Sequence, residues 1–567
     1  MNHTNTTLDN ALLQGLIKET SWKTTENGAA ALNTTYAPLL DLFGTIGALR
    51  TRSASDIIDL FMKAYTSNRL LAMKTLFYAR DIRGGLGERQ TFRTIAHHLA
   101  LHHPEDILLN LALIPEYGRF DDLFIFFGTP LQEHALQYIN RQFFEDAAIL
   151  SAAKREGTLF SEVHISLLAK WLPSENASSH ITKERAHLIR KALHLSSRQY
   201  RITLSLMRKC LGVVECKMSA NAWPDIDYSA VPSVAALRYR AAFDSHDHER
   251  YHEFLDAVNT GTTKINASTL YPYDIVRDYI NNPATSYHYD SVVIEEPIST
   301  LEAQWKALPD YINNSTENFL IMADVSGSMT CQNNTPYSTS IGLAIYFAER
   351  SHGAFKNYFM TFSEKPKLVR IDPSLTLAEK ITAVSKEVGY NTNLEAAFEL
   401  LLKTAYNNNV LPSEMPKAII VISDMEIDSA THSRSESEAL TFTEDMSRHF
   451  KEAGYTMPTL VYWNVCARQN TFHATMQDNI RFVSGQSPSV FKGLCENLGD
   501  TSIDLLLKTL NTPRYEAIHV ATHTEGNTDD DGDGENHDKK TKKGINPSKE
   551  NFYKQEELDL DRLLLDR

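Results

Sequence analysis

The spacing of apolar residues changes near residue 315, and this change limits the folds that the chain can adopt. From about residue 53 onward, apolar residues recur at helical spacing, as Ile57, Phe61 and Tyr65 do behind the candidate helix caps Ser53 and Ser55. Beyond residue 315, short β-rich apolar runs alternate with helical stretches. The runs cover 318–326, 357–363, 417–425, 459–467 and 480–485. We therefore expect an α + α/β protein, in which a doubly wound, mostly parallel sheet follows a helical region.

The expected domains follow from this division. Residues 1–52 form an N-terminal segment, and the many short amphipathic helices of 53–310 predict HEAT-like helical hairpins, stacked into a solenoid or closed into a ring. The α/β domain is expected to span 315–512. Residues 524–550 contain almost no apolar side chains and are predicted to be disordered, whereas 551–567 regain leucines and could form a short helix.

Composition excludes several classes of protein. The 567 residues carry a formal net charge of -15, which argues against a uniformly basic nucleic-acid binder but not against a local basic patch. Five cysteines without a CxxC pair favour reduced thiols over a disulfide framework or a zinc site. Neither a membrane-spanning apolar run nor a secretory leader is recognisable, so we expect a cytoplasmic protein without a membrane partner.

The motif MADVSGSM contains the most specific pattern of polar residues. It places Asp324, Ser326 and Ser328 directly after the first predicted strand of the α/β domain. Ligands bind at that edge of an open α/β sheet, and a hard cation such as Mg2+ (or Mn2+) prefers about six oxygen ligands. Asp424 ends another predicted strand, and Thr392 opens a helix, so both could offer oxygens there. The alternative is an ordinary turn with a helix-capping serine.

These residues resemble the metal-ion-dependent adhesion site of von Willebrand factor A domains. The resemblance implies that Ser326, Ser328 and Thr392 supply hydroxyl ligands, while Asp324 and Asp424 act directly or through water. It also implies an open coordination position that a partner's aspartate or glutamate, or a phosphate, can fill. Because the motif has neither a histidine base nor an activated nucleophile beside it, we expect a binding protein rather than an enzyme such as a nuclease or phosphatase.

The helical region contains one strongly basic segment. Residues 183–209 hold eight lysines and arginines against one glutamate. On a helical wheel, residues 183–194 of this segment form an amphipathic helix with a basic stripe along one face, and such a stripe can bind the phosphates of RNA. Tyr200 and Tyr239 could stack on bases. The candidate RNA-binding residues are Lys183, His187, Arg190, Lys191, Arg198 and Arg201. The alternative is an ordinary solvated helix face, with the tyrosines packed in the core.

A second resemblance bears on this region. The segments 80–93, 114–124, 167–179, 213–223 and 230–243 are similar to an uncharacterised family in which a helical region precedes a von Willebrand A domain, itself similar to the TROVE module of the Ro autoantigen. This resemblance implies binding of structured or single-stranded RNA in a ribonucleoprotein. Apart from this resemblance, the glycine-rich stretch RDIRGGLGER is expected to be an interhelical turn in which Asp81 and Glu88 pair with the arginines of the same segment. The rival hypothesis is a metal-dependent protein-interaction scaffold that binds no RNA.

Overall fold

The structure is a computed structural model that describes residues 21–288, 291–312, 318–362, 365–387, 392–427, 442–475, 480–491, 494 and 500–522. The predicted tail (524–550) and C-terminal helix (551–567) therefore lie outside the described residues, as do the first 20 residues of the N-terminal segment. No described helix is both long and apolar enough to span a membrane.

The described chain is mostly helical before residue 313, as the spacing of apolar residues predicts. The helices of this part are α2 (Pro38–Phe43), α3 (Ala54–Ser67), α4 (Arg69–Arg80), α5 (Arg89–His102), α6 (Pro104–Asn110), α7 (Ile114–Tyr117), α8 (Gln132–Glu156), α9 (Leu168–Trp171), α10 (His180–Ala192), α11 (Ser197–Cys210), α12 (Val214–Ser219), α13 (Ser233–His246), α14 (His248–Asn259), α15 (Pro272–Ile280) and α16 (Ser299–Lys306). Two short hairpins accompany them, β1 (Trp22–Thr24) with β2 (Ala30–Leu32) and β3 (Ser286–His288) with β4 (Ser291–Val293). Ser53 caps α3 by accepting a hydrogen bond from the amide of Asp56.

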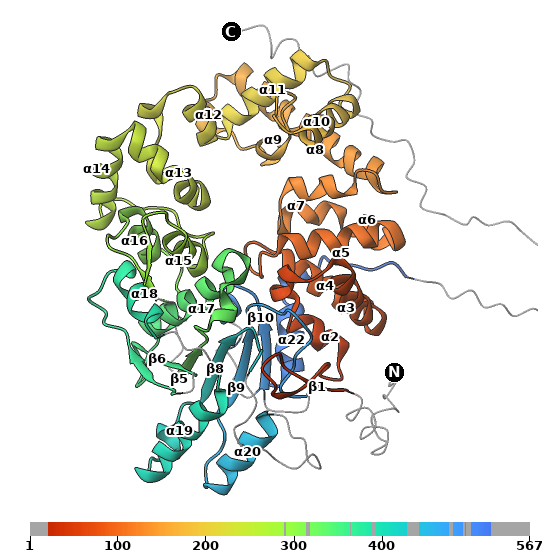
Figure 1. The fold of residues 1–567 in the computed structure, drawn as a ribbon. Coiled ribbons are helices and arrows are strands. Elements are labelled where there is room, and N and C mark those ends of the chain that lie inside the picture. The colour runs from red at the N-terminus through yellow and green to blue at the C-terminus, as the bar shows by residue number, and fades with distance from the viewer. Residues whose placement is uncertain are drawn as a thin grey trace, which may run out of the picture. The chain divides into compact units, whose positions relative to one another are not determined.

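A mixed sheet with mostly parallel strands follows, which confirms the predicted α + α/β class at this level (Figure 1). Its strands are β5 (Phe319–Ala323), β6 (Tyr358–Thr361), β7 (Leu368–Arg370), β8 (Ala418–Ser423), β9 (Thr459–Asn464) and β10 (Ile480–Ser484), in the spatial order β10-β9-β8-β5-β6-β7. All neighbours are parallel except β6 and β7. The three-residue edge strand β7 was not predicted, because it is too short to form an apolar run.

Helices cover both faces of this sheet, so its central strands β5, β8 and β9 are buried along their whole length and are mostly apolar. These helices are α17 (Cys331–Arg350), α18 (Leu377–Ser385), α19 (Leu394–Asn407), α20 (Phe442–Glu452) and α22 (Ser502–Leu510). On one face, Phe398 of α19 and Phe450 of α20 join a core with Met322 and Tyr462. On the other, Phe347 of α17 packs against Trp463 and Phe491.

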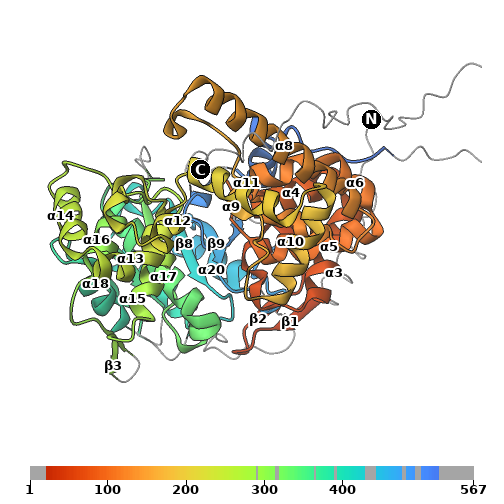
Figure 2. The ribbon, with the colours of Figure 1, turned by 90° about the horizontal axis from the view of Figure 1, so that it is seen from above.

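Tertiary contacts divide the chain into two compact units. The first contains Met1–Leu99, Glu116–Gly118 and Asn221–His519, and the second contains Ala100–Pro115, Arg119–Ala220 and Val520–Arg567. The first unit therefore combines the sheet with helices from both ends of the predicted helical region and with the N-terminal hairpin. Within this unit, α13 to α18 lie together in both views (Figures 1 and 2). Gly342 allows α17 to approach α15 closely, since a Cβ there would lie 3.1 Å from the carbonyl carbon of Pro272.

The glycine-rich stretch forms a turn between α4 and α5, as predicted. The pairing of its acidic residues differs from the prediction, which assigned them to the arginines of the stretch itself. In the structure, Asp81 pairs with Arg514 and Glu88 with Arg50, because the folded chain brings these distant arginines to the turn. Gly85 lets the chain pass directly over α4, because a Cβ at this position would lie 2.0 Å from the carbonyl oxygen of Tyr78. The turn therefore joins the segments around residues 50 and 514 within the first unit through these ion pairs.

Candidate functional site

The ends of β5 and β8 meet at the point where the order of the strands reverses. Ala323 lies opposite Ile422, so Asp324 and Ser423 leave the sheet at the same level. Ser423 in turn lies opposite Asn464 at the end of β9. In a doubly wound sheet this reversal opens a crevice beyond the carboxyl ends of the strands, where ligands bind. Residues that follow all three strands therefore reach one place.

The DVSGS loop after β5 brings three of the five predicted metal ligands together. The Asp324 carboxylate accepts hydrogen bonds from the amide of Ser326 (2.9 Å) and from the hydroxyl of Ser423 (2.7 Å). The hydroxyl oxygens of Ser326 and Ser328 are 3.0 Å apart. Adjacent oxygens in an octahedral shell with bonds of ~2.0–2.1 Å lie about 2.9 Å apart, so this pair has the spacing of one edge of a Mg2+ shell.

Asp424 lies beside this loop and already has a cationic partner. Its carboxylate is 1% exposed and forms an ion pair with Arg468, which also pairs with Glu26 at 2.8 Å. The hydroxyl of Ser423 is 2.7 Å from Asp324 and 3.4 Å from Asp424, and so links the two carboxylates. Met425, the next residue, has a positive φ of 66°, a strained conformation for a side chain of this kind.

Thr392 lies on the third loop and is 2% exposed. Its hydroxyl donates to the carbonyl oxygen of Glu426 (3.0 Å) and accepts from Asn27 (3.1 Å). Thr392 is thus joined to the chain two residues beyond Asp424. The three loops meet at one edge of the sheet, and Asn27 of the N-terminal hairpin connects two of them.

Burial and like charge shape the electrostatics of this site. Desolvation, together with the neighbouring carboxylate of Asp424, raises the pKa of Asp324 to about 6, against hydrogen bonds from Ser326 and Ser423 that lower it. Two buried carboxylates with one arginine leave an excess of negative charge, which a dication would neutralise. The donor set of carboxylates and hydroxyls fits Mg2+ or Mn2+.

Two cysteines lie next to this site. The sulfur atoms of Cys331 and Cys466 are 3.7 Å apart and belong to segments that follow β5 and β9. A hydrogen bond from Cys466, helped by the charge of Arg468, lowers the pKa of Cys331 to about 7, whereas the same pairing raises the pKa of Cys466. None of the four described cysteines forms a disulfide.

The predicted RNA-binding residues lie on α10 and α11 of the second unit, where both helices pack against α8. Five of the six are exposed: Lys183, His187, Lys191, Arg198 and Arg201. Together these five residues form what we term the basic face. Ser179 and Ser196 start the two helices by accepting hydrogen bonds from backbone amides.

Arg190 and Tyr200 instead have structural partners. Arg190 is half-buried, pairs with Glu175 at 2.8 Å and donates to the carbonyl oxygen of Leu195 at 2.7 Å. Tyr200 is fully buried, stacks on Phe143 and donates its hydroxyl to the carbonyl of Pro173. The alternative of a core tyrosine therefore holds for Tyr200. Tyr239 is half-buried and contacts Phe243 edge-on.

Sequence patterns missed several residues at the sheet edge, namely Glu26, Asn27, Ser423, Glu426 and Arg468. Ser423 and Arg468 could have been found, because Ser423 ends β8, Arg468 lies four residues after β9, and parallel strands end at a common edge. No local signal marks Glu26 and Asn27, because the residues that they contact, Thr392 and Glu426, lie roughly four hundred positions further along the chain.

Fold and site together define a class of protein in which a helical region accompanies a doubly wound sheet with carboxylates and hydroxyls at its reversal point. Sequence comparison divides the chain at nearly the same place. A family model described as domain of unknown function DUF2828 matches residues 25–120 and 175–317, and another, domain of unknown function DUF7788, matches 318–549.

The chain is 30% identical to uncharacterized protein L728 of Acanthamoeba polyphaga mimivirus over 533 residues, which is 88% of this chain and 89% of that protein. The chain therefore belongs to the same family as this viral protein. The crystal structure of the Ro (RSR) protein of Deinococcus radiodurans is also similar, over 84% of this chain and 99% of that one. That match has 12% identity and a TM-score of 0.35, which is too low to establish a shared fold.

Proposed function

We propose that this protein is a non-catalytic RNA-binding protein of the Ro type, whose α/β domain carries a divalent-metal site of the von Willebrand A kind. The basic face supports the RNA-binding part. Lys183, Lys191 and Arg201 are exposed, and none of them has an ion-pair partner among the described residues. Such side chains can neutralise phosphates and release counterions. Arg190 acts here as a positioning residue, because it holds α10 to Glu175 and to the turn before α11.

Fluorescence anisotropy with structured and single-stranded RNA over a salt series tests this part. We expect Lys183→Glu with Lys191→Glu to weaken binding at least about tenfold. Because each lost phosphate contact removes ~0.7 from the slope of log K against log salt for single strands, that slope should fall by about 1.4. The matched control is Lys264→Glu with Lys403→Glu, which changes the net charge equally at positions of the first unit. Absence of RNA binding, or equal weakening in both variants, would refute the proposal.

The sheet-edge cluster supports the metal part. Asp324, Ser326, Ser328, Thr392 and Asp424 would hold Mg2+ or Mn2+, and the cation would supply an electrophilic position for a carboxylate or phosphate of a partner. The observation that favours a shared cation over a simple capped turn is that Ser326 forms no capping hydrogen bond with its side chain, although it precedes the helical turn Gly327–Thr330. Its hydroxyl instead forms a 3.0 Å hydrogen bond with the hydroxyl of Ser328. Whether the helical hairpins close into a ring stays a prediction.

Titration calorimetry with MnCl2 checks the metal site on its own. Ser326→Ala with Asp424→Ala should lower Mn2+ affinity at least about tenfold, since it removes a hydroxyl and a carboxylate. Ser374→Ala is the control, because this serine forms a similar hydroxyl–carboxylate contact with Asp372 on the surface. If the wild type, the double variant and Ser374→Ala all bind Mn2+ with equal affinity, the proposed metal site is refuted. A protein that binds Mn2+ and acidic peptides but no RNA would favour the interaction scaffold instead.

A further inference from the structure

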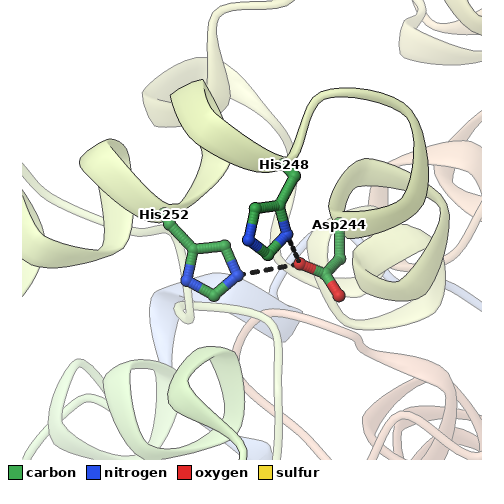
Figure 3. A group of neighbouring side chains, drawn as sticks. All are labelled: Asp244, His248 and His252. Atoms are coloured by element: carbon green, nitrogen blue, oxygen red, sulfur yellow. Dashed lines mark hydrogen bonds and ion pairs between the residues drawn. The ribbon is translucent and has the colours of Figure 1, made fainter.

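Two histidines and an aspartate meet on the surface of the helical part of the first unit. Asp244 lies in the last turns of α13, and His248 and His252 lie one turn apart on α14 (Figure 3). The same carboxylate oxygen, Oδ1 of Asp244, is 2.9 Å from Nδ1 of His248 and 2.8 Å from Nε2 of His252. The two imidazole rings are 4.2 Å apart between centroids.

We propose that Asp244, His248 and His252 form a surface site for a transition-metal dication of the zinc class. Their three nearest ligand atoms all lie within 4.8 Å of one another. Ligands of a tetrahedral Zn2+, bound at ~2.0–2.1 Å, are separated by about 3.3 Å. The distances from the carboxylate oxygen to the two nitrogens therefore need to open by only about half an ångström, which small rotations of exposed side chains can provide.

The spacing of the ligands is that of a helical chelate. Histidines at positions i and i+4 face the same side of a helix, so both nitrogens can bind one ion without a change in the backbone. The carboxylate comes from the preceding helix, across a break at Asp247, whose φ of -147° ends α13. A bound ion would therefore join α13 to α14, with water in its remaining positions.

The neighbouring cation does not compete for this aspartate. Arg250, on the same helix, is paired with Asp247 at 3.0 Å and donates to the carbonyl oxygens of Trp223 and Ile226. The hydroxyl of Tyr228 also donates to Asp247. These contacts hold Asp247 and Arg250 together, while the carboxylate of Asp244 contacts the two imidazoles.

The ligands also distinguish this site from the sheet-edge cluster. Imidazole nitrogens favour zinc, copper and nickel, whereas hydroxyls and carboxylates favour magnesium and manganese. The two sites share no residue, so either can be absent without affecting the other.

Isothermal titration calorimetry of the full chain with ZnCl2 tests the proposal. We expect one site that His248→Ala with His252→Ala weakens at least about tenfold. Asp244→Asn should weaken it as well, because it keeps an oxygen that can accept hydrogen bonds but removes the charge. His180→Ala is the matched control, since His180 is an exposed helical histidine close to the carboxylate of Glu184.

Two further measurements distinguish this site from zinc binding at the cysteines or at scattered side chains. Electron paramagnetic resonance with CuCl2 should show coupling to two nitrogens in the wild-type protein and lose it in the double variant. Hydrogen exchange should slow in 240–256 when Zn2+ is added, because the ion joins two helices. Zinc binding that persists in the double variant, or that disappears in Cys331→Ser instead, would overturn the proposal and leave Asp244 as a plain hydrogen-bond acceptor.

Discussion

Arg468 places a guanidinium against the buried carboxylate of Asp424, at the position where the proposed metal site needs negative charge. At the scale of a single residue, this arginine is an internal cation that would compete with a metal ion at the proposed site. Breaking such a pair leaves a buried charge without its partner, which typically costs ~3–5 kcal/mol of stability. A metal ion at the proposed site and the ion pair with Arg468 would therefore neutralise the same carboxylate, Asp424.

We expect Arg468→Gln to raise Mn2+ affinity several-fold while lowering the melting temperature in EDTA. The reason is that the variant leaves the negative charge of Asp424 to the metal alone. Paramagnetic resonance titration measures the affinity, and a thermal melt with and without Mn2+ measures whether the metal restores stability. Arg370→Gln, at an exposed position on β7, serves as the control. Unchanged or weaker Mn2+ binding in Arg468→Gln would contradict a shared site.

At the scale of elements, the hairpin of β1 and β2 belongs to the sheet domain, although it comes from the opposite end of the sequence. Thr25 donates its hydroxyl to the carbonyl of Ile427 (2.6 Å), and the amides of Leu32 and Phe472 donate to each other's carbonyl oxygens. Asn27 donates to the carbonyl of Glu426 (2.7 Å) and to the hydroxyl of Thr392. The hairpin thus supports two of the loops that surround the candidate metal site.

Asn27→Ala should loosen these two loops without unfolding the domain. Loss of hydrogen bonds worth about 1 kcal/mol predicts roughly fivefold faster local hydrogen exchange, in 392–396 and 424–427. Mass spectrometry of exchange measures this directly. Asn408→Ala, which removes an exposed hydrogen bond at the end of α19, should leave both segments unchanged. Equal exchange in Asn27→Ala and the wild type would mean that the hairpin does not position the loops.

At the scale of the whole molecule, charge is distributed unevenly. The chain carries a net charge of -15, yet the basic face of α10 and α11 contains exposed lysines and arginines of one sign. The net negative charge of the whole chain repels a polyanion such as RNA, whereas the basic face attracts it, so the proposed RNA binding should be confined to this face and strongly salt-dependent.

The alignment with the viral relative covers 88% of the chain, so the family resemblance extends over most of its length.

The sequence by itself determined the long helical region, the five apolar strands of the sheet and the edge at which its parallel strands end, but not the three-residue strands β1 to β4 and β7. Strands β5 and β8 are apolar except for Ser423 at the end of β8, because both faces of each strand are buried, and polar residues mark where the strands end. The motif around Asp324 was predictable for the same reason, since a loop after a parallel strand lies at a known edge. The exposed lysines of α10 followed equally from helical periodicity.

Only the tertiary structure decided which groups these residues meet. Periodicity reports which side of a helix is buried, but it does not report what lies on the other side of the contact. Arg190 therefore pairs with Glu175, Arg468 with Asp424, and Asn27 with Thr392, none of which is visible in a sequence window. The physical reason is that a charge or hydrogen-bonding group is satisfied by whatever the folded chain places within about 3 Å of it.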